Sequence, residues 1–245
     1  MFWSVRRRVG GLFLLVGIGT TVVGVPALGA MTYAADVSSG SVLAATRTAI
    51  AAQIGVHVVF TAHSGSTGLT ETIIADVGTK EGTETIIESS ADVAIRVTPT
   101  FAYVSGNSSG LTRLFGMSSA DAKELGRRWE AWKIGTSQYG TLESDLTMQS
   151  VSALLPRTKG TRVSTDRRHG TTLYVLTWTT PATTSIPKLS NSLAVAAQGP
   201  TLPISKSATA SGGTKITTAL SKWGEDVVVQ APPSDRILLP GKLGG

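Results

Sequence analysis

Residues 106–110 (GNSSG) match the G-x-S-x-G pattern that, in α/β-hydrolases, exposes a nucleophilic serine on a sharp turn between a strand and a helix. A hydrolase would also need a histidine and an acid further along the chain, namely His169 with one of Asp121, Asp145 and Asp166. That turn requires a parallel sheet with helical crossovers, whereas the flanking segments have the spacing of hairpins. A secreted serine hydrolase using Ser108 is therefore a lesser alternative, because so short a pattern also arises by chance in loops rich in serine and glycine.

The other residue types that could do chemistry do not converge. His57 and His63 would project from one face of a strand, but six residues at about 3.3 Å each separate them by roughly 20 Å, too far for one metal ion. The absence of cysteine excludes thiolate metal sites and cysteine nucleophiles. The carboxylate pairs Glu143/Asp145 and Glu225/Asp226 lie in stretches that resemble loops. We expect no catalytic residue, no metal site and no cofactor, and the chain is not expected to be an enzyme.

The first 30 residues have the composition of an export signal. Three arginines at 6–8 precede 22 uncharged residues at 9–30, and small residues that a signal peptidase accepts follow. An uncleaved anchor is the competing interpretation, because a stretch of that length can just span a bilayer. In both cases the arginines stay in the cytoplasm and the rest of the chain crosses the membrane. The expected organisation is a signal peptide or N-terminal membrane anchor at 1–35 and one domain at 36–245, secreted or held in the cell envelope.

The charge is mild once the export segment is set aside. The net charge is +6, and the arginines at 6–8 supply half of it. Because exported proteins seldom meet nucleic acid, no nucleic-acid partner is expected. Basic clusters at 127–133 and 157–168 are typical of solvated faces, with docking on anionic head groups at a membrane surface as the sharper alternative.

Alternating apolar and polar residues dominate the remaining chain. Such runs, joined by short glycine turns, predict antiparallel hairpins. The strand-like runs, about ten in number apart from shorter pieces, lie at 56–62, 69–77, 83–89, 92–98, 101–103, 129–132, 162–168, 172–179, 193–197, 202–208, 215–220 and 227–230. Helices are expected at 41–54, 111–116, 118–126 and 146–155. The helices are short, so they either close a filled core or leave a hollow that takes an apolar ligand.

Two stretches carry a family resemblance. Residues 94–155 contain, in order, a "YV-x-G" turn, an "L-x-x-LFG" helix, a Gly-x-x-Trp strand and a "Leu-Thr…LL" helix. Residues 221–233 (SKWGEDVVVQAPP) match a closing "WG-x-x-V-x-V-x-APP" strand. This series resembles the actinobacterial envelope proteins related to the mycobacterial lipoproteins LppX and LprG. Many of those proteins carry a lipobox cysteine, which this chain lacks.

The resemblance implies an α+β, LolA-like fold. In that fold a curved antiparallel sheet forms an incomplete barrel, and short helices cover its concave face. A cavity between sheet and helices holds the acyl chains of a lipid or lipoglycan. The implied lining from the sheet is Val56, Val58, Phe60, Val93, Ile95, Val97, Phe101 and Tyr103. The implied lid is Leu111, Leu114, Phe115, Val151, Leu154 and Leu155.

The function that the resemblance implies is lipid binding or lipid transport without bond chemistry. The partners would be an acyl-chain lipid or lipoglycan and a membrane surface. An envelope sensor or regulatory binding module with the same fold is the alternative.

Overall fold

The computed structural model describes residues 37–238 except 169, 184–186 and 211. The expected signal or anchor segment at 1–35 lies outside the described residues. The helices are α1 (Ser39–Ala51), α2 (Ser108–Arg113), α3 (Ser119–Leu125), α4 (Ser137–Asp145) and α5 (Met148–Ser152), with a 3-10 turn at Ser234–Arg236. The strands are β1 (Gly55–His63), β2 (Thr70–Gly78), β3 (Gly82–Glu88), β4 (Ala91–Val97), β5 (Phe101–Gly106), β6 (Trp129–Lys133), β7 (Arg162–Arg168), β8 (Thr171–Thr180), β9 (Leu189–Ala196), β10 (Pro203–Ala210), β11 (Lys215–Ser221) and β12 (Ile237–Leu238).

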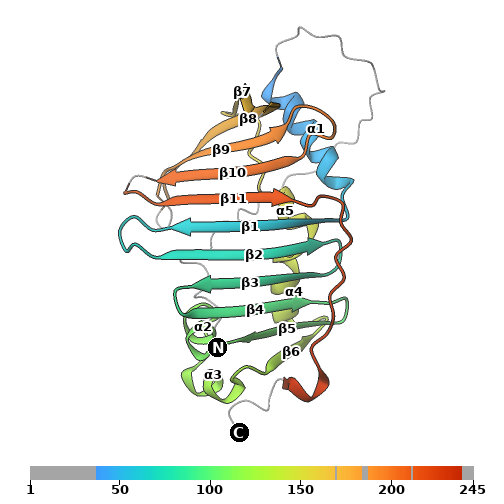
Figure 1. Ribbon diagram of the computed structural model, residues 1–245, viewed down its shortest axis with the longest axis vertical. Helices are drawn as coiled ribbons and strands as arrows, with labels where there is room; N and C mark the ends of the chain where they lie inside the picture. Colours follow the sequence, from blue (N-terminus) through green and yellow to red (C-terminus); the bar gives the residue numbers. More distant parts are fainter. Residues whose placement is uncertain (1–36, 169, 184–186, 211, 239–245) are drawn as a thin grey trace.

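These strands form one open sheet in the order β12-β6-β5-β4-β3-β2-β1-β11-β10-β9-β8-β7. From β1 to β6 each strand pairs with the next one along the chain, and the same holds from β7 to β11. Strand β1 joins these two meanders by pairing with β11. Every pair is antiparallel except that of β12 with β6. Figure 1 shows the strands as one wall with α4 and α5 behind it. The expected fold class, a curved antiparallel incomplete barrel with short covering helices, is confirmed.

Alternation along the strands decides which face is covered. Val93, Ile95 and Val97 of β4 are each at most 1% exposed, while the intervening residues are partly exposed. The face that carries these residues is called the inner face here, and the opposite one the outer face. Four of the helices begin where a serine, threonine or asparagine side chain accepts a hydrogen bond from a backbone N–H of the first turn, the N-caps being Ser38, Asn107, Ser118 and Thr136.

Two apolar clusters pack on the inner face. The larger cluster joins residues of β1–β6 to residues of α2, α4 and α5. The smaller cluster joins Val42 and Leu43 of α1 to Leu176 of β8 and to Leu193 and Val195 of β9. Leu155, just after α5, packs against both clusters. No helix in the described ranges is long and apolar enough to cross a membrane.

Two expectations for local structure are wrong. Residues 227–230 form no strand; they pass the strand ends, where Val229 N–H donates to Glu81 Oε2 and Arg96 donates to the Gln230 carbonyl. Side chains thus make backbone hydrogen bonds in this segment that neighbouring strands would make in a sheet. The stretch around Glu143 and Asp145, expected to be a loop, belongs to α4.

Candidate functional site

One row of directly opposed residues crosses nine strands on the inner face. From β4 to β7 this central row comprises Val93, Ile86, Ile73, Phe60, Thr218, Lys206, Leu193, Leu176 and Val163. At about 4.8 Å between strands, the row is roughly 38 Å long. Seven of its nine members are apolar, and the two polar members are adjacent at its middle. The inner face is therefore a long apolar track with one polar interruption.

Most of the residues expected to line the sheet side do lie on this face. Each of them is at most 4% exposed, and they are Val56, Val58 and Phe60 of β1 and Val93, Ile95 and Val97 of β4. The expected lid residues Leu111, Phe115, Val151 and Leu154 are also buried, while Leu114 and Leu155 are partly buried. All of these except Phe60 belong to or pack on the larger cluster. The wall and the lid thus meet in direct packing, and lipid contact by these residues stays a prediction.

Phe101 and Tyr103 lie on the outer face, so placing them beside the other lining residues was wrong. Val97 pairs with Ala102 and Ile95 with Val104, whereas Tyr103 opposes Arg96. The connection between the paired residues Val97 and Ala102 has four residues, an even number, so odd positions face inward on β4 and outward on β5. Ala102 and Val104 are the inward residues of β5.

Several inner-face residues were missed by sequence reasoning. Ile73 and Ile86 belong to strands whose run of threonine and isoleucine left the phase ambiguous, because both faces carry isoleucine. Ile74 and Ile87, the neighbours that point outward, are 39% and 40% exposed. The phase of β2 and β3 follows only from their pairing with β1 and β4.

The middle of the central row holds a buried lysine. Lys206 is 9% exposed, and its ammonium nitrogen lies 5.5 Å from the centre of the Trp178 ring. Burial lowers the pKa of Lys206 from 10.5 to about 8, because the charged form loses its hydration. Thr218 beside it is 2% exposed, and among the described residues its hydroxyl has no hydrogen-bond partner.

A second buried charge lies near the far end of the inner face. Glu130 of β6 opposes Val104 and is 9% exposed. Burial raises the pKa of Glu130 to about 7, and the negative charge of Asp121 adds to the effect. This carboxyl is thus protonated in part of the population at neutral pH.

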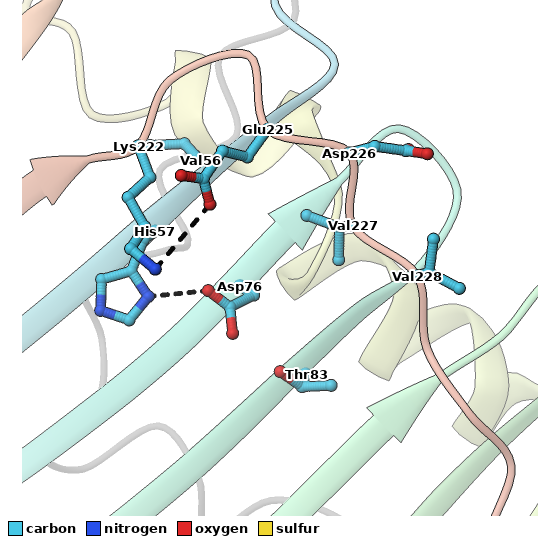
Figure 2. A pocket seen from close by; sticks show the side chains of 9 residues that line it. All are labelled: Val56, His57, Asp76, Thr83, Lys222, Glu225, Asp226, Val227 and Val228. Atoms are coloured by element: carbon cyan, nitrogen blue, oxygen red, sulfur yellow. Dashed lines mark hydrogen bonds and ion pairs between the residues drawn. The ribbon is translucent and has the colours of Figure 1, made fainter.

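The described hollows lie at one edge of the sheet and not between the inner face and the helices. A hollow of about 250 Å³ is bounded by the ends of β1–β3 and by the segment after β11; its lining residues are Val56, His57, Asp76, Thr83, Lys222, Glu225, Asp226, Val227 and Val228 (Figure 2). Another, of about 400 Å³, lies between the β2–β3 turn and the junction of α4 with α5. Among the residues that the structure describes, the wall and the lid pack directly on one another, and neither of these two hollows lies between them.

The first hollow contains a histidine–carboxylate pair without the arrangement that activates a hydroxyl. His57 Nδ1 and Asp76 Oδ1 are 2.7 Å apart (Figure 2). Across the strands the order is His57, Asp76, Thr83, so the carboxylate separates the imidazole from the only hydroxyl of that lining. A nucleophile would need the imidazole as its direct neighbour. His63 instead contacts Thr70, and the described residues contain no group of three metal-ligating side chains.

The GNSSG segment has a packing role. A Cβ atom at Gly106 would lie 2.4 Å from the Asp92 carbonyl oxygen, and one at Gly110 would lie 2.0 Å from it. Asn107 caps α2 by accepting a hydrogen bond from Gly110 N–H at 2.7 Å. Ser108 is exposed at the start of α2, after an antiparallel strand. His169, its only candidate base, lies outside the described residues.

No protein-family model matches the chain, and no curated protein matches it. Among solved structures it is similar to the lipoprotein LppX of Mycobacterium tuberculosis, with 16% identity and a TM-score of 0.46 over 79% of this chain and 100% of that one. It is similar to LprF of Mycobacterium bovis, with 15% identity and a TM-score of 0.47 over 78% and 95%. A chain of the Pseudomonas aeruginosa MucA/MucB complex gives 14% identity and a TM-score of 0.34 over 79% and 58%. LppX is one of the two proteins named in the sequence resemblance.

Proposed function

We propose that this protein is an exported, non-enzymatic lipid-binding protein of the cell envelope that holds acyl chains between the inner face and its helices. The observation that carries the proposal is the central row, an apolar track that contributes residues to both clusters. Each CH₂ group moved from water to an apolar site gains about 0.8 kcal/mol, so a sixteen-carbon chain gains on the order of 12 kcal/mol. Export is proposed from the composition of residues 1–35.

The helices that cover the larger cluster suit a movable lid. Helices α2, α3, α4 and α5 have 6, 7, 9 and 5 residues. Helices shorter than about 12–15 residues are not stable alone, so these depend on packing against the sheet. An acyl chain entering beneath them would exchange apolar contacts for apolar contacts. Where the wall and the lid pack directly on one another, the lid must open before a lipid can bind.

Adjacent isoleucines on β2 allow a matched test. Ile73 lies in the central row and is partly buried, whereas Ile74 points to the outer face and is 39% exposed. We expect Ile73→Asp to weaken the binding of a fluorescent fatty acid at least about tenfold, because it places a charge on the apolar track. Ile74→Asp should bind like the wild type.

A second variant, in the lid, tests the same binding face in case Ile73→Asp does not fold. Leu114, at the end of α2, is partly buried and packs on the larger cluster, so Leu114→Asp should also weaken binding. Far-ultraviolet circular dichroism and thermal unfolding identify the folded variants. If folded Ile73→Asp and Leu114→Asp both take up the fatty acid as the wild type does, the proposed binding face is wrong.

A further inference from the structure

Lys206 occupies the centre of a row that is otherwise apolar apart from its neighbour Thr218. Across the strands it lies between Thr218 of β11 and Leu193 of β9, and its ammonium faces the Trp178 ring. Lysine is almost never this buried without a charged partner, since an ammonium removed from water loses its hydration. An aromatic ring replaces only part of that loss.

The charge has no counterion in the described part of the chain. None of the ion pairs among those residues includes Lys206. Glu71, an acid on the same face, lies three strands away in the neighbouring row, roughly 14 Å by strand spacing. The Thr218 hydroxyl, opposite Lys206, is likewise without a partner among these residues. The Thr218 hydroxyl is therefore a buried hydrogen-bond donor without an acceptor, and beside it the Lys206 ammonium has no ion pair among the described residues.

We propose that Lys206 and Thr218 bind the anionic head group of an acyl lipid. This proposal rests on the proposed lipid-binding function and names the class of lipid. The ammonium would donate a charge-assisted hydrogen bond to a carboxylate or phosphate oxygen, and the Thr218 hydroxyl would donate a second. A neutral lipid would leave the Lys206 ammonium without a counterion, so the pair discriminates against it.

The apolar parts of the row fit acyl chains on either side of that head group. Four strand spacings separate Thr218 from Val93, about 19 Å, and three separate Lys206 from Val163, about 14 Å. Half of a bilayer's hydrocarbon core is about 15 Å thick, which is the depth that one layer of acyl chains occupies. A lipid with its anion at the middle and chains running both ways would match the row.

The test compares two lipids that have the same acyl chain, one with a charged head group and one with an uncharged head group. Fluorescence titration near neutral pH measures the affinity for cis-parinaric acid and for its uncharged methyl ester. We expect the full-length wild type to prefer the acid, Lys206→Met to lower the acid-to-ester affinity ratio about tenfold, and Thr218→Val to lower it about threefold. Lys215→Met is the matched control, because Lys215 of β11 is exposed on the outer face; it should leave the ratio unchanged.

The outcomes distinguish failure of the head-group subsite from failure of the proposed lipid binding. If the wild type binds neither probe, lipid binding fails and the head-group subsite fails with it. If both probes bind and folded Lys206→Met keeps the wild-type ratio, only the subsite is overturned. Inorganic phosphate at millimolar concentration should not displace the acid. Full displacement would assign the pair to a free anion and would also overturn the proposal.

Discussion

Glu130 provides a quantitative test of the packing on the inner face. Its pKa is about 7 in the folded protein, raised by burial, compared with 4.5 for an exposed glutamate. Below pH 4.5 the folded and unfolded states both hold the proton. Between 4.5 and 7 the unfolded chain releases it while the folded chain keeps it, so stability falls as the pH rises. Above 7 the folded state bears the full cost of a buried carboxylate.

The cost follows from the two pKa values. Their difference corresponds to about 3 kcal/mol, which solvent screening near the end of the sheet reduces to about 2 kcal/mol. Glu130→Gln removes the ionisable group, so the variant should gain about 2 kcal/mol over the wild type on going from pH 4.5 to pH 8. Urea unfolding at a series of pH values measures this difference.

A control isolates the buried carboxyl from the general titration of the protein. The wild-type protein, measured under the same conditions, keeps every other titrating group and is therefore the control. If Glu130→Gln and the wild type lose stability in parallel between pH 4.5 and 8, the carboxyl is not buried in the folded protein. Burial would then not raise the pKa of Glu130.

Three further predictions concern stability. Gly110→Ala should destabilise the protein by about 3 kcal/mol or prevent folding, because its Cβ would lie 2.0 Å from a backbone carbonyl oxygen. Gly140→Ala in α4 should instead stabilise the protein by about 0.5–1 kcal/mol, because a Cβ there meets nothing within 4 Å. Thermal unfolding measures both effects, and equal effects would refute the packing role of Gly110. Lys206→Met should be more stable than the wild type by about 3 kcal/mol near pH 7. This gain should vanish above pH 10.5, where the lysine has lost its proton in both the folded and the unfolded protein. A gain that does not change with pH would contradict the burial of Lys206 as a cation. Tyr139→Phe should lose about 1 kcal/mol, because the phenol donates a hydrogen bond to the Thr98 carbonyl at 3.0 Å, and an unchanged midpoint would show that this bond adds nothing.

Strands with one apolar face could be placed from the sequence alone. Val56, Val58 and Phe60, and then Val93, Ile95 and Val97, recur at every second position, and all six face inward. Alternation is a direct consequence of the two-residue period of a strand, so it needs no tertiary information. The elements that lack such a face were harder. Helix α4 buries only Tyr139 and Leu142, too few apolar positions for a helical stripe to stand out.

The phase between neighbouring strands could not be predicted in the same way. Phe101 and Tyr103 form an aromatic pair 6.0 Å apart on the outer face, where Arg96 lies over Trp129. Aromatic residues in a strand suggest a core, but an even-numbered connection reversed the parity between β4 and β5. The register of a turn decides such cases, and hydrophobicity does not.

Lys206 shows the same limit at the candidate site. The pairing of β10 with β9 shifts register between Pro203 and Ser205, so Pro203 and Lys206 both face inward although their positions differ by an odd number. In the strand itself, PISKSATA, the face of Lys206 also carries two alanines and the other face carries serine and threonine, so no large apolar residue marks the inward side beyond Ile204. A β-bulge reorients every residue beyond it, and its position followed only from the structure.

Native mass spectrometry of the full chain, purified from its own host, tests the lipid-binding proposal most directly. We expect a population heavier than the polypeptide by the mass of an acyl lipid, with that mass absent from the folded Ile73→Asp variant and present in Ile74→Asp. A wild-type protein that carries only the polypeptide mass and takes up no fatty acid when one is supplied would contradict the account.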